Sequence, residues 1–368
     1  MTRFEAVQMS PFDRQTRGAA QLSAVAQQEW SVAAPLGELE RIGANPIFVD
    51  ELERFAADVR DPRCAAVAER LATPLRVAVS GRAGVGRSTA ARALVRVGEQ
   101  RGTITLISEP SDAELNVYLL AEVVKPEDRA AIGAIDRPVL TVLTKADLIA
   151  TNEVGRYPQG PTSAAGARCR QLSGRTGLSI EPLVGILAVA ALDGLVDDTV
   201  WAGLQELAAG GHVAAPVQRR LLDILDAFGI AQAIAAIRVG ATRTEAVTVL
   251  RRLSRIDDVV DAIERLGAQA RYQRVLDAVA DLETLAVTDP RISEFLSRDD
   301  TVVARMMAAM DVVEAAGFVV DRGDTADRHL RRALDWRRGR PVADVHRVCS
   351  ADIVRGSLRL WAEAGGAA

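Results

Sequence analysis

The stretch LRVAVSGRAGVGRSTAARAL, residues 75 to 94, decides the fold of the chain around it. An apolar run leads into Gly81, a glycine-rich segment follows, and Ser88 and Thr89 open an alanine-rich segment with the composition of a helix. The spacing fits the phosphate-binding pattern G-x-x-x-x-G-K-[ST] at every position except the lysine. We therefore expect a strand, a tight loop and a helix in succession.

A loop of this kind binds anions through its main chain. Its backbone N–H groups point inward, and the helix macrodipole adds partial positive charge at the same place. The Ser88 hydroxyl is the expected Mg²⁺ ligand. The residues expected to contact phosphate are Gly81, Arg82, Ala83, Gly84, Val85, Gly86, Arg87, Ser88 and Thr89.

Arg87 stands where the pattern has lysine. The planar guanidinium is longer than the compact ammonium group and cannot occupy the same point without displacing something. The backbone donors are untouched by this difference. We therefore expect nucleotide binding to be retained but weakened, and catalysis to lose more, because phosphoryl transfer depends on positioned charge.

Outward from this stretch, short apolar runs alternate with helix-like segments. The runs are LRVAVS (75–80), TITLIS (103–108), LNVYLLA (115–121), RPVLTVLT (137–144) and LVGILAVAAL (183–192). Strands that alternate with helices predict a parallel sheet covered on both faces. The fold class expected is α/β, with a GTPase-like P-loop NTPase domain over residues 75–210.

Helical signals flank this domain on both sides. On the C-terminal side, apolar residues recur at i, i+3, i+4 and i+7 in three sets that begin at Leu221, Ile256 and Tyr272. The domains expected are a flexible N-terminus over 1–18, a helical segment over 19–74 and a C-terminal helical bundle over 211–368. We expect the two helical regions to pack together as one bundle.

A second motif follows the run at 137–144. Thr144, Lys145, Ala146 and Asp147 match the [NT]-K-x-D element of GTP-binding proteins. The Asp147 carboxylate can accept two hydrogen bonds from guanine N1 and N2, a donor pair that adenine lacks. Thr144, Lys145 and Asp147 are therefore the expected guanine-binding residues, with the Lys145 stem lying against the base.

These motifs together resemble the dynamin-like large GTPases of bacteria, in particular the isoniazid-inducible branch. The likeness also includes GILAVAALDG (185–194) and LLDILDAFGIAQAIAAIRVGA (221–241), and it is good over residues 74 to about 285. The resemblance implies GTP or GDP with Mg²⁺ as ligands, a backbone contact from Ala190 to the purine, and a helical stalk. It also implies a homo- or hetero-oligomer with a related dynamin-like GTPase.

The two mobile segments of regulated GTPases are missing from the pattern. Only GEQRG (98–102) separates the first predicted helix from the strand TITLIS, which leaves no room for a threonine-bearing switch loop. No D-x-x-G follows that strand, and Asp112, with Glu109, is a weak stand-in as a metal ligand. We expect a degenerate GTPase with slow or absent hydrolysis.

Two alternatives to a GTP-binding protein stay open. One is a pseudoenzyme scaffold in which the P-loop survives as a fold element and binds no nucleotide. The other is a P-loop ATPase or kinase, which the guanine-selecting carboxylate at 147 disfavours. Nucleotide competition and calorimetric titration separate the three.

Composition and charge exclude several classes. Apolar residues make up 49% of the chain and charged residues 26%, which is ordinary for a folded globular protein. The net charge of -4 gives no reason to expect a nucleic-acid partner, and RRALDWRRGR (331–340) is interpreted as a solvated helix face. We expect a cytoplasmic protein with reduced cysteines and no zinc site. Peripheral membrane contact through residues 227–237 is less favoured than burial of that stretch in a core.

Overall fold

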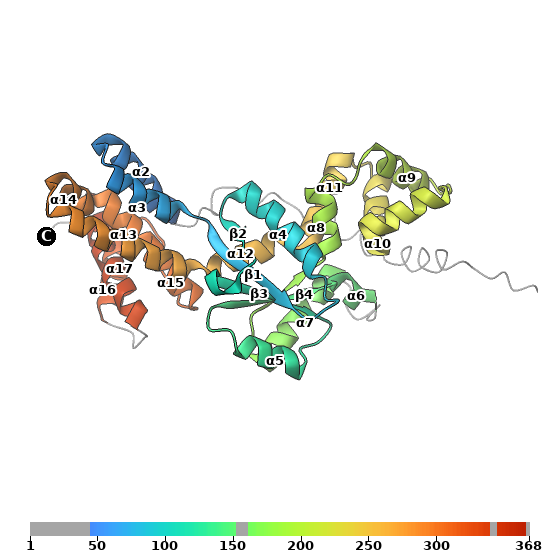
Figure 1. The fold of residues 1–368 in the computed structure, drawn as a ribbon, viewed down its shortest axis with the longest axis horizontal. Coiled ribbons are helices and arrows are strands. Elements are labelled where there is room, and N and C mark those ends of the chain that lie inside the picture. The colour runs from blue at the N-terminus through green and yellow to red at the C-terminus, as the bar shows by residue number, and fades with distance from the viewer. Residues whose placement is uncertain (1–44, 152–160, 339–343, 366–368) are drawn as a thin grey trace, which may run out of the picture. The chain divides into compact units, whose positions relative to one another are not determined.

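The computed structural model describes residues 45–151, 161–338 and 344–365, which divide into two units. The first unit holds the described part of 76–263, and the second holds the described parts of 36–75 and 264–368 (Figure 1). The predicted N-terminal segment 1–18, and residues 19–44 of the predicted helical segment, lie outside the described residues.

A five-stranded sheet forms the centre of the first unit. Its strands, in spatial order, are β2 (Ile104–Leu106), β1 (Leu75–Gly81), β3 (Leu115–Ala121), β4 (Val139–Thr144) and β5 (Ile180–Leu183). Six of the seven residues of β3 are buried, which explains why this central strand is mostly apolar rather than alternating, with Asn116 as a buried polar residue. The parallel registers pair Gly81 with Leu119, Ala121 with Thr144, and Thr144 with Leu183. The ends of these strands therefore meet at one edge of the sheet.

Helices cover both faces of the sheet, as the sequence predicts (Figure 1). On one face, Tyr118, Leu120 and Leu143 pack against side chains of α5 and α7. On the other face lie α4 and α8, which contact each other. The bounds are α4 (Arg87–Arg101), η1 (Pro110–Asp112), α5 (Pro126–Gly133), α6 (Ala146–Thr151), α7 (Pro161–Thr176) and α8 (Gly185–Leu192). The chain passes from β1 to its neighbour β2 on one side, whereas β3, on the other side of β1, leads on to β4 and β5. The direction of the strand order therefore changes between β1 and β3, and α/β sheets bind ligands at such a switch point.

The last apolar run is divided differently from expectation. The single strand predicted over 183–192 is wrong, because β5 ends at Leu183 and residues 185–192 form α8. A continuous apolar run does not distinguish a buried strand from a buried helix. Here the segment is enclosed on several sides, and Leu187, Ala188, Val189 and Ala190 are all buried.

Four more helices follow in the chain, and most of their length belongs to the first unit. They are α9 (Asp198–Ala208), α10 (Ala215–Arg238), α11 (Arg243–Ser254) and α12 (Ile256–Leu266). Leu225 and Phe228 of α10 share a core cluster with Leu187 of α8 and Val200 of α9. The boundary expected after residue 210 therefore falls inside α12 instead. Residues 228–233 are buried in this core, as predicted for the stretch 227–237.

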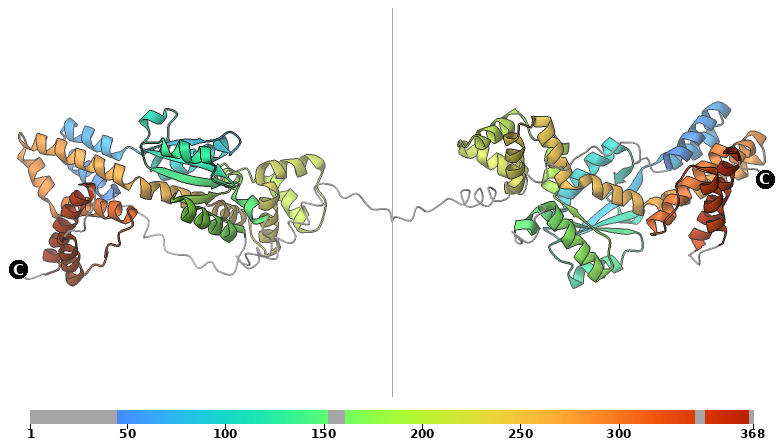
Figure 2. Two further views of the ribbon diagram at one scale, coloured as in Figure 1. Left: turned by 90° about the horizontal axis from the view of Figure 1, so that it is seen from below. Right: turned by 180° about the vertical axis from the view of Figure 1, so that it is seen from behind.

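The second unit joins helices from both ends of the chain. The Phe48 and Leu52 side chains of α2 share a core cluster with Val279 of α13, and the Phe55 ring stacks on Phe295 at 4.3 Å. This confirms the prediction that the two helical regions pack together, and Figure 2 shows the blue and orange helices side by side. The helices are α2 (Asn45–Val59), α3 (Pro62–Ala72), α13 (Ala268–Ala286), α14 (Pro290–Ser297), α15 (Asp299–Ala315), α16 (Ala326–Arg337) and α17 (Asp344–Glu363).

Cys64, Cys169 and Cys349 are buried and unpaired, which agrees with the prediction of reduced core cysteines. Among the described helices, none has both the length and the apolar character needed to cross a bilayer. Nor does any group of three metal-binding side chains gather within the described ranges.

Gly98 tests how closely α4 packs on β2. A Cβ atom at this position would lie 2.8 Å from the Ile104 carbonyl oxygen and 3.1 Å from its Cγ1. We expect Gly98→Ala to lower the free energy of unfolding by about 1–3 kcal/mol, because the backbone must shift. Gly174→Ala, in α7 with open space around it, is the control and is expected to raise stability by about 0.5–1 kcal/mol. Denaturant titration measures both, and equal effects would contradict the packing described.

Candidate functional site

The segment between β1 and α4 turns through three glycines with positive φ values. Gly81, Gly84 and Gly86 have φ values of 136°, 80° and 88°, which side chains rarely allow. At Gly81 a Cβ atom would also lie 2.7 Å from the Leu119 carbonyl oxygen of the neighbouring strand. The glycines of the motif are therefore required by the backbone itself.

The loop presents a row of unused donors. Within the described residues, the N–H groups of residues 83 to 89 donate to no backbone or side-chain acceptor. Gly86 caps α4 without a side-chain hydrogen bond, and Ala83, Gly84, Arg87 and Ser88 are exposed. Free N–H groups at a helix N-terminus form an anion site. The loop is thus open and can accept a phosphate group.

Arg82, the second residue of the motif, points away from this row of donors. Its Nε donates to Asp128 Oδ1 at 2.7 Å and its Nη2 to Oδ2 at 3.2 Å. The fully buried Asp128 carboxylate also accepts from Tyr118 Oη at 3.0 Å and from the Lys125 N–H at 2.9 Å. Burial raises the pKa of Asp128, but these hydrogen bonds outweigh burial and hold the pKa below its usual value. Arg82 therefore anchors the loop to α5.

Thr144 holds the loop from the opposite side. Its hydroxyl lies 2.6 Å from the Val85 carbonyl oxygen and 2.8 Å from that of Leu120, and it donates to these acceptors from the buried end of β4. This contact brings the two sequence motifs together directly. Thr144 is consequently a positioning residue for the loop.

Asp147 lies in the first turn of α6 and is 6% exposed. Burial raises the pKa of its carboxyl group, its own backbone N–H opposes that effect, and the charge of Asp226 raises the pKa further. Asp226 itself sits at a kink of α10 with φ 56°. Asp147 forms no ion pair within the described part of the chain. A pair of N–H donors would satisfy it.

Lys145 precedes α6 with φ 53° and is exposed. Its side chain is thus accessible at the same strand end as Asp147. The exposed Arg87 likewise forms no ion pair with any described residue. Both cations are available to a ligand at this edge.

Ala190 does not lie on a loop. It belongs to α8, is fully buried, and its carbonyl oxygen accepts from the Leu195 N–H at 3.1 Å. The residues that directly follow β5 are Val184 and Gly185 instead. A Cβ atom on Gly185 would lie 3.4 Å from Thr89 Cγ2, so the start of α8 packs against the start of α4. The sequence does not predict this contact, because the apolar run at 183–192 is read as one strand whereas β5 ends at Leu183.

Asp112 and Glu109 are exposed and lie away from Ser88. The Ile107 N–H donates to Val77 O at 3.0 Å and the Glu114 N–H to Arg76 O at 2.9 Å, so the segment turns back beside the beginning of β1. The phosphate loop follows the other end of β1, about 15 Å further at 3.3 Å per residue. The metal ligand set expected from Ser88 and Asp112 is therefore not assembled.

Comparison with known proteins adds no relative. No model of a known protein family matches the chain, and no curated protein matches it significantly. The geometry of the loop and of the end of β4 is therefore the basis for any functional assignment.

Thr144 and Thr141, both buried on β4, provide a matched pair of tests. Thr144→Val removes the hydroxyl from Val85 and Leu120, and we expect a loss of about 1–3 kcal/mol in the free energy of unfolding. The Thr141 hydroxyl has no hydrogen-bond partner among the residues that the structure describes, so Thr141→Val is expected to be neutral or stabilising. Equilibrium denaturation measures both. Equal losses would show that Thr144 contributes only its packing.

Proposed function

We propose that the chain binds GTP and GDP at the carboxyl edge of the sheet. The observation that supports this most strongly is the hydrogen bond from Thr144 to the Val85 carbonyl, which joins the phosphate-type loop to the segment that carries Asp147. A ligand held by the loop and read by Asp147 must contain both a phosphate and a base with adjacent donors. Guanine nucleotides have this combination.

The phosphates would be held by the N–H groups of residues 83 to 89, with added charge from Arg87. The Ser88 hydroxyl, exposed in the first turn of α4, fits a Mg²⁺ ion that arrives with the nucleotide. Mg²⁺ commonly keeps waters and phosphate oxygens as its other ligands. No carboxylate of the 107–114 segment would complete the site, because that segment lies beside the beginning of β1.

Guanine selection would come from Asp147. Its ionised carboxylate can accept from guanine N1 and N2 together, whereas adenine presents an acceptor at N1. This favours GTP and GDP over ATP, and so argues against an ATPase or kinase. The Lys145 side chain, exposed beside it, would cover the base.

Hydrolysis is proposed to be slow. The helix α4 ends at Arg101 and β2 begins at Ile104, so the connection is too short for a switch loop. With Arg87 in the lysine position and the 107–114 segment beside the beginning of β1, phosphoryl transfer would lose the lysine charge and the carboxylate expected from Asp112. The role of the chain would then be to assemble with a dynamin-like partner GTPase through its helical second unit.

A nucleotide-free scaffold is the second candidate. The observation that favours it is the 6% exposure of Asp147, whose neighbour Ala146 packs in the core cluster of Leu225 and Phe228. A nucleotide base would have to displace some of these core side chains to reach the Asp147 carboxylate. Calorimetric titration distinguishes the two proposals, since the scaffold takes up neither GDP nor GTP at millimolar concentration.

Asp147→Asn tests base recognition, because it replaces one carboxylate oxygen, an acceptor, with an amide NH₂ group, a donor. Xanthine carries a carbonyl oxygen where guanine carries the N2 amino group, so the variant is expected to bind GDP at least tenfold more weakly and xanthosine diphosphate more tightly than the wild type. Asp112→Asn is the matched control and is expected to change neither affinity. Isothermal titration of the wild type and both variants with both nucleotides gives the six dissociation constants. Unchanged GDP affinity in Asp147→Asn would remove Asp147 from the site.

Turnover of GTP by the purified full chain tests the catalytic part. We expect a rate on the order of 10⁻³ s⁻¹ or lower, similar to GTPases that lack a supplied arginine. Phosphate release under single-turnover conditions measures it, with Ser88→Ala as the comparison. A fast rate that Ser88→Ala abolishes would contradict the proposal of a degenerate enzyme.

A further inference from the structure

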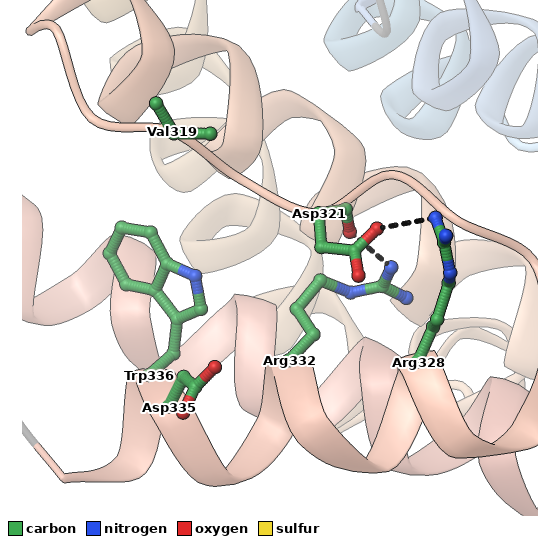
Figure 3. A pocket seen from close by; sticks show the side chains of 6 residues that line it. All are labelled: Val319, Asp321, Arg328, Arg332, Asp335 and Trp336. Carbon is green, nitrogen blue, oxygen red and sulfur yellow. Dashed lines mark hydrogen bonds and ion pairs between the residues drawn. The ribbon is translucent and has the colours of Figure 1, made fainter.

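A cavity of about 500 Å³ lies in the second unit, beside α16 and the segment that leads into it (Figure 3). Trp336 and Val319 supply apolar surface, while Arg328 and Arg332 supply two guanidinium groups one helical turn apart. Val319 is 87% exposed, so the cavity opens to solvent on that side. The lining residues are Val319, Asp321, Arg328, Arg332, Asp335 and Trp336.

Arg332 contradicts the sequence interpretation of residues 331–340 as a solvated face. It is only 4% exposed. Its Nε donates to Ser357 Oγ at 2.8 Å, and its Nη1 donates to the Asp321 carbonyl at 2.7 Å and the Gly323 carbonyl at 3.4 Å. All of these acceptors are neutral. The run of arginines in the sequence therefore contains one buried cation, Arg332, beside exposed ones.

The remaining partner of Arg332 is neutral as well. Its Nη2 lies 2.8 Å from His329 Nδ1, and His329 Nε2 lies 3.3 Å from Asp324 Oδ1. A histidine that accepts at Nδ1 carries its hydrogen at Nε2, facing Asp324, and is uncharged. Burial lowers the pKa of Arg332, although Asp321 and Asp324 act in the opposite direction. The guanidinium charge is therefore buried without a hydrogen-bonded counter-ion.

The neighbouring charges are matched with one another. The carboxylate of Asp321 pairs with Arg328 at 3.2 Å, which one of the two dashed lines in Figure 3 marks. Both side chains are about half exposed, so this pair is weak and exchangeable. Arg322 pairs with Asp311 and Glu314. An anion that enters the cavity can thus replace Asp321 at Arg328 at small cost.

We propose that this cavity binds a small organic monocarboxylate, with its carboxylate at Arg332 and Arg328 and its apolar body against Trp336 and Val319. The fork of Arg328 matches the planar geometry of a carboxylate, and Arg332 keeps one Nη2 N–H without an acceptor among the described residues. The buried position strengthens the attraction. The volume is in the range of small-molecule sites. The exposed Asp335 carboxylate also lines the cavity, so a second negative charge on the ligand is disfavoured.

Isothermal titration of the full chain with benzoate tests the proposal, with benzamide as the uncharged analogue and phenyl phosphate as the more highly charged one. We expect saturable binding of benzoate, at least fivefold weaker binding of phenyl phosphate, and none of benzamide. Absence of benzoate binding would overturn the proposal. So would equal binding of benzamide, because the charge would then play no part.

Variants locate the site. Arg332→Gln and Arg328→Gln are each expected to weaken benzoate binding at least tenfold. Arg331→Gln, an exposed neighbour on the same helix that forms no ion pair among the described residues, is the matched control and is expected to bind as the wild type. Because Arg332 also holds residues 321–323 to α16, thermal unfolding is measured for each variant. If Arg332→Gln is unfolded, the benzoate affinity of Arg328→Gln alone tests the proposed site. Equal losses in Arg331→Gln would show non-specific charge attraction and overturn the site.

Discussion

The hydrogen bond from the Thr144 hydroxyl to the Val85 carbonyl connects segments 59 residues apart, and the candidate nucleotide site depends on it. It forms because β1 and β4 flank β3 in parallel register, so their carboxyl ends lie at the same edge. Arg82 holds the other side of the loop through Asp128. Side chains that need not touch a ligand thus fix the loop, and its N–H groups stay free.

The same constraint explains which parts of the fold could be predicted from sequence. The apolar pattern predicts the strand 115–121 with its observed bounds, because a central parallel strand is mostly apolar on both faces. The closeness of the loop to Thr144 and Asp147 followed from the rule that parallel strands end at one edge. Local pattern and a general rule of topology were sufficient for both.

Other features depend on tertiary context and could not be predicted in this way. The apolar run at 183–192 fits a buried strand and a buried helix equally well, so the sequence does not show that Ala190 lies inside a helix. The position of Asp112 depends on where the chain turns back beside β1, and the partnership of Arg82 with Asp128 spans 46 residues. Arg332 stands in a charged run, and only packing against Ser357 and the preceding segment buries it.

The two candidate sites share one feature: each contains a buried charged side chain without a counter-ion among the described residues. Among the described residues, the buried aspartates and arginines are Asp128, Asp147, Arg332 and Asp352. Asp128 pairs with Arg82, and Asp352 pairs with Arg305 while accepting from Tyr272 Oη.

Asp147 and Arg332 have no such partner, and a buried charge without a counter-ion costs several kcal/mol in the folded protein. A fold that pairs its other buried charges would gain stability by pairing these two as well. Their isolation is explained if ligands complete them: guanine N–H donors at Asp147 in one unit, and a carboxylate at Arg332 in the other.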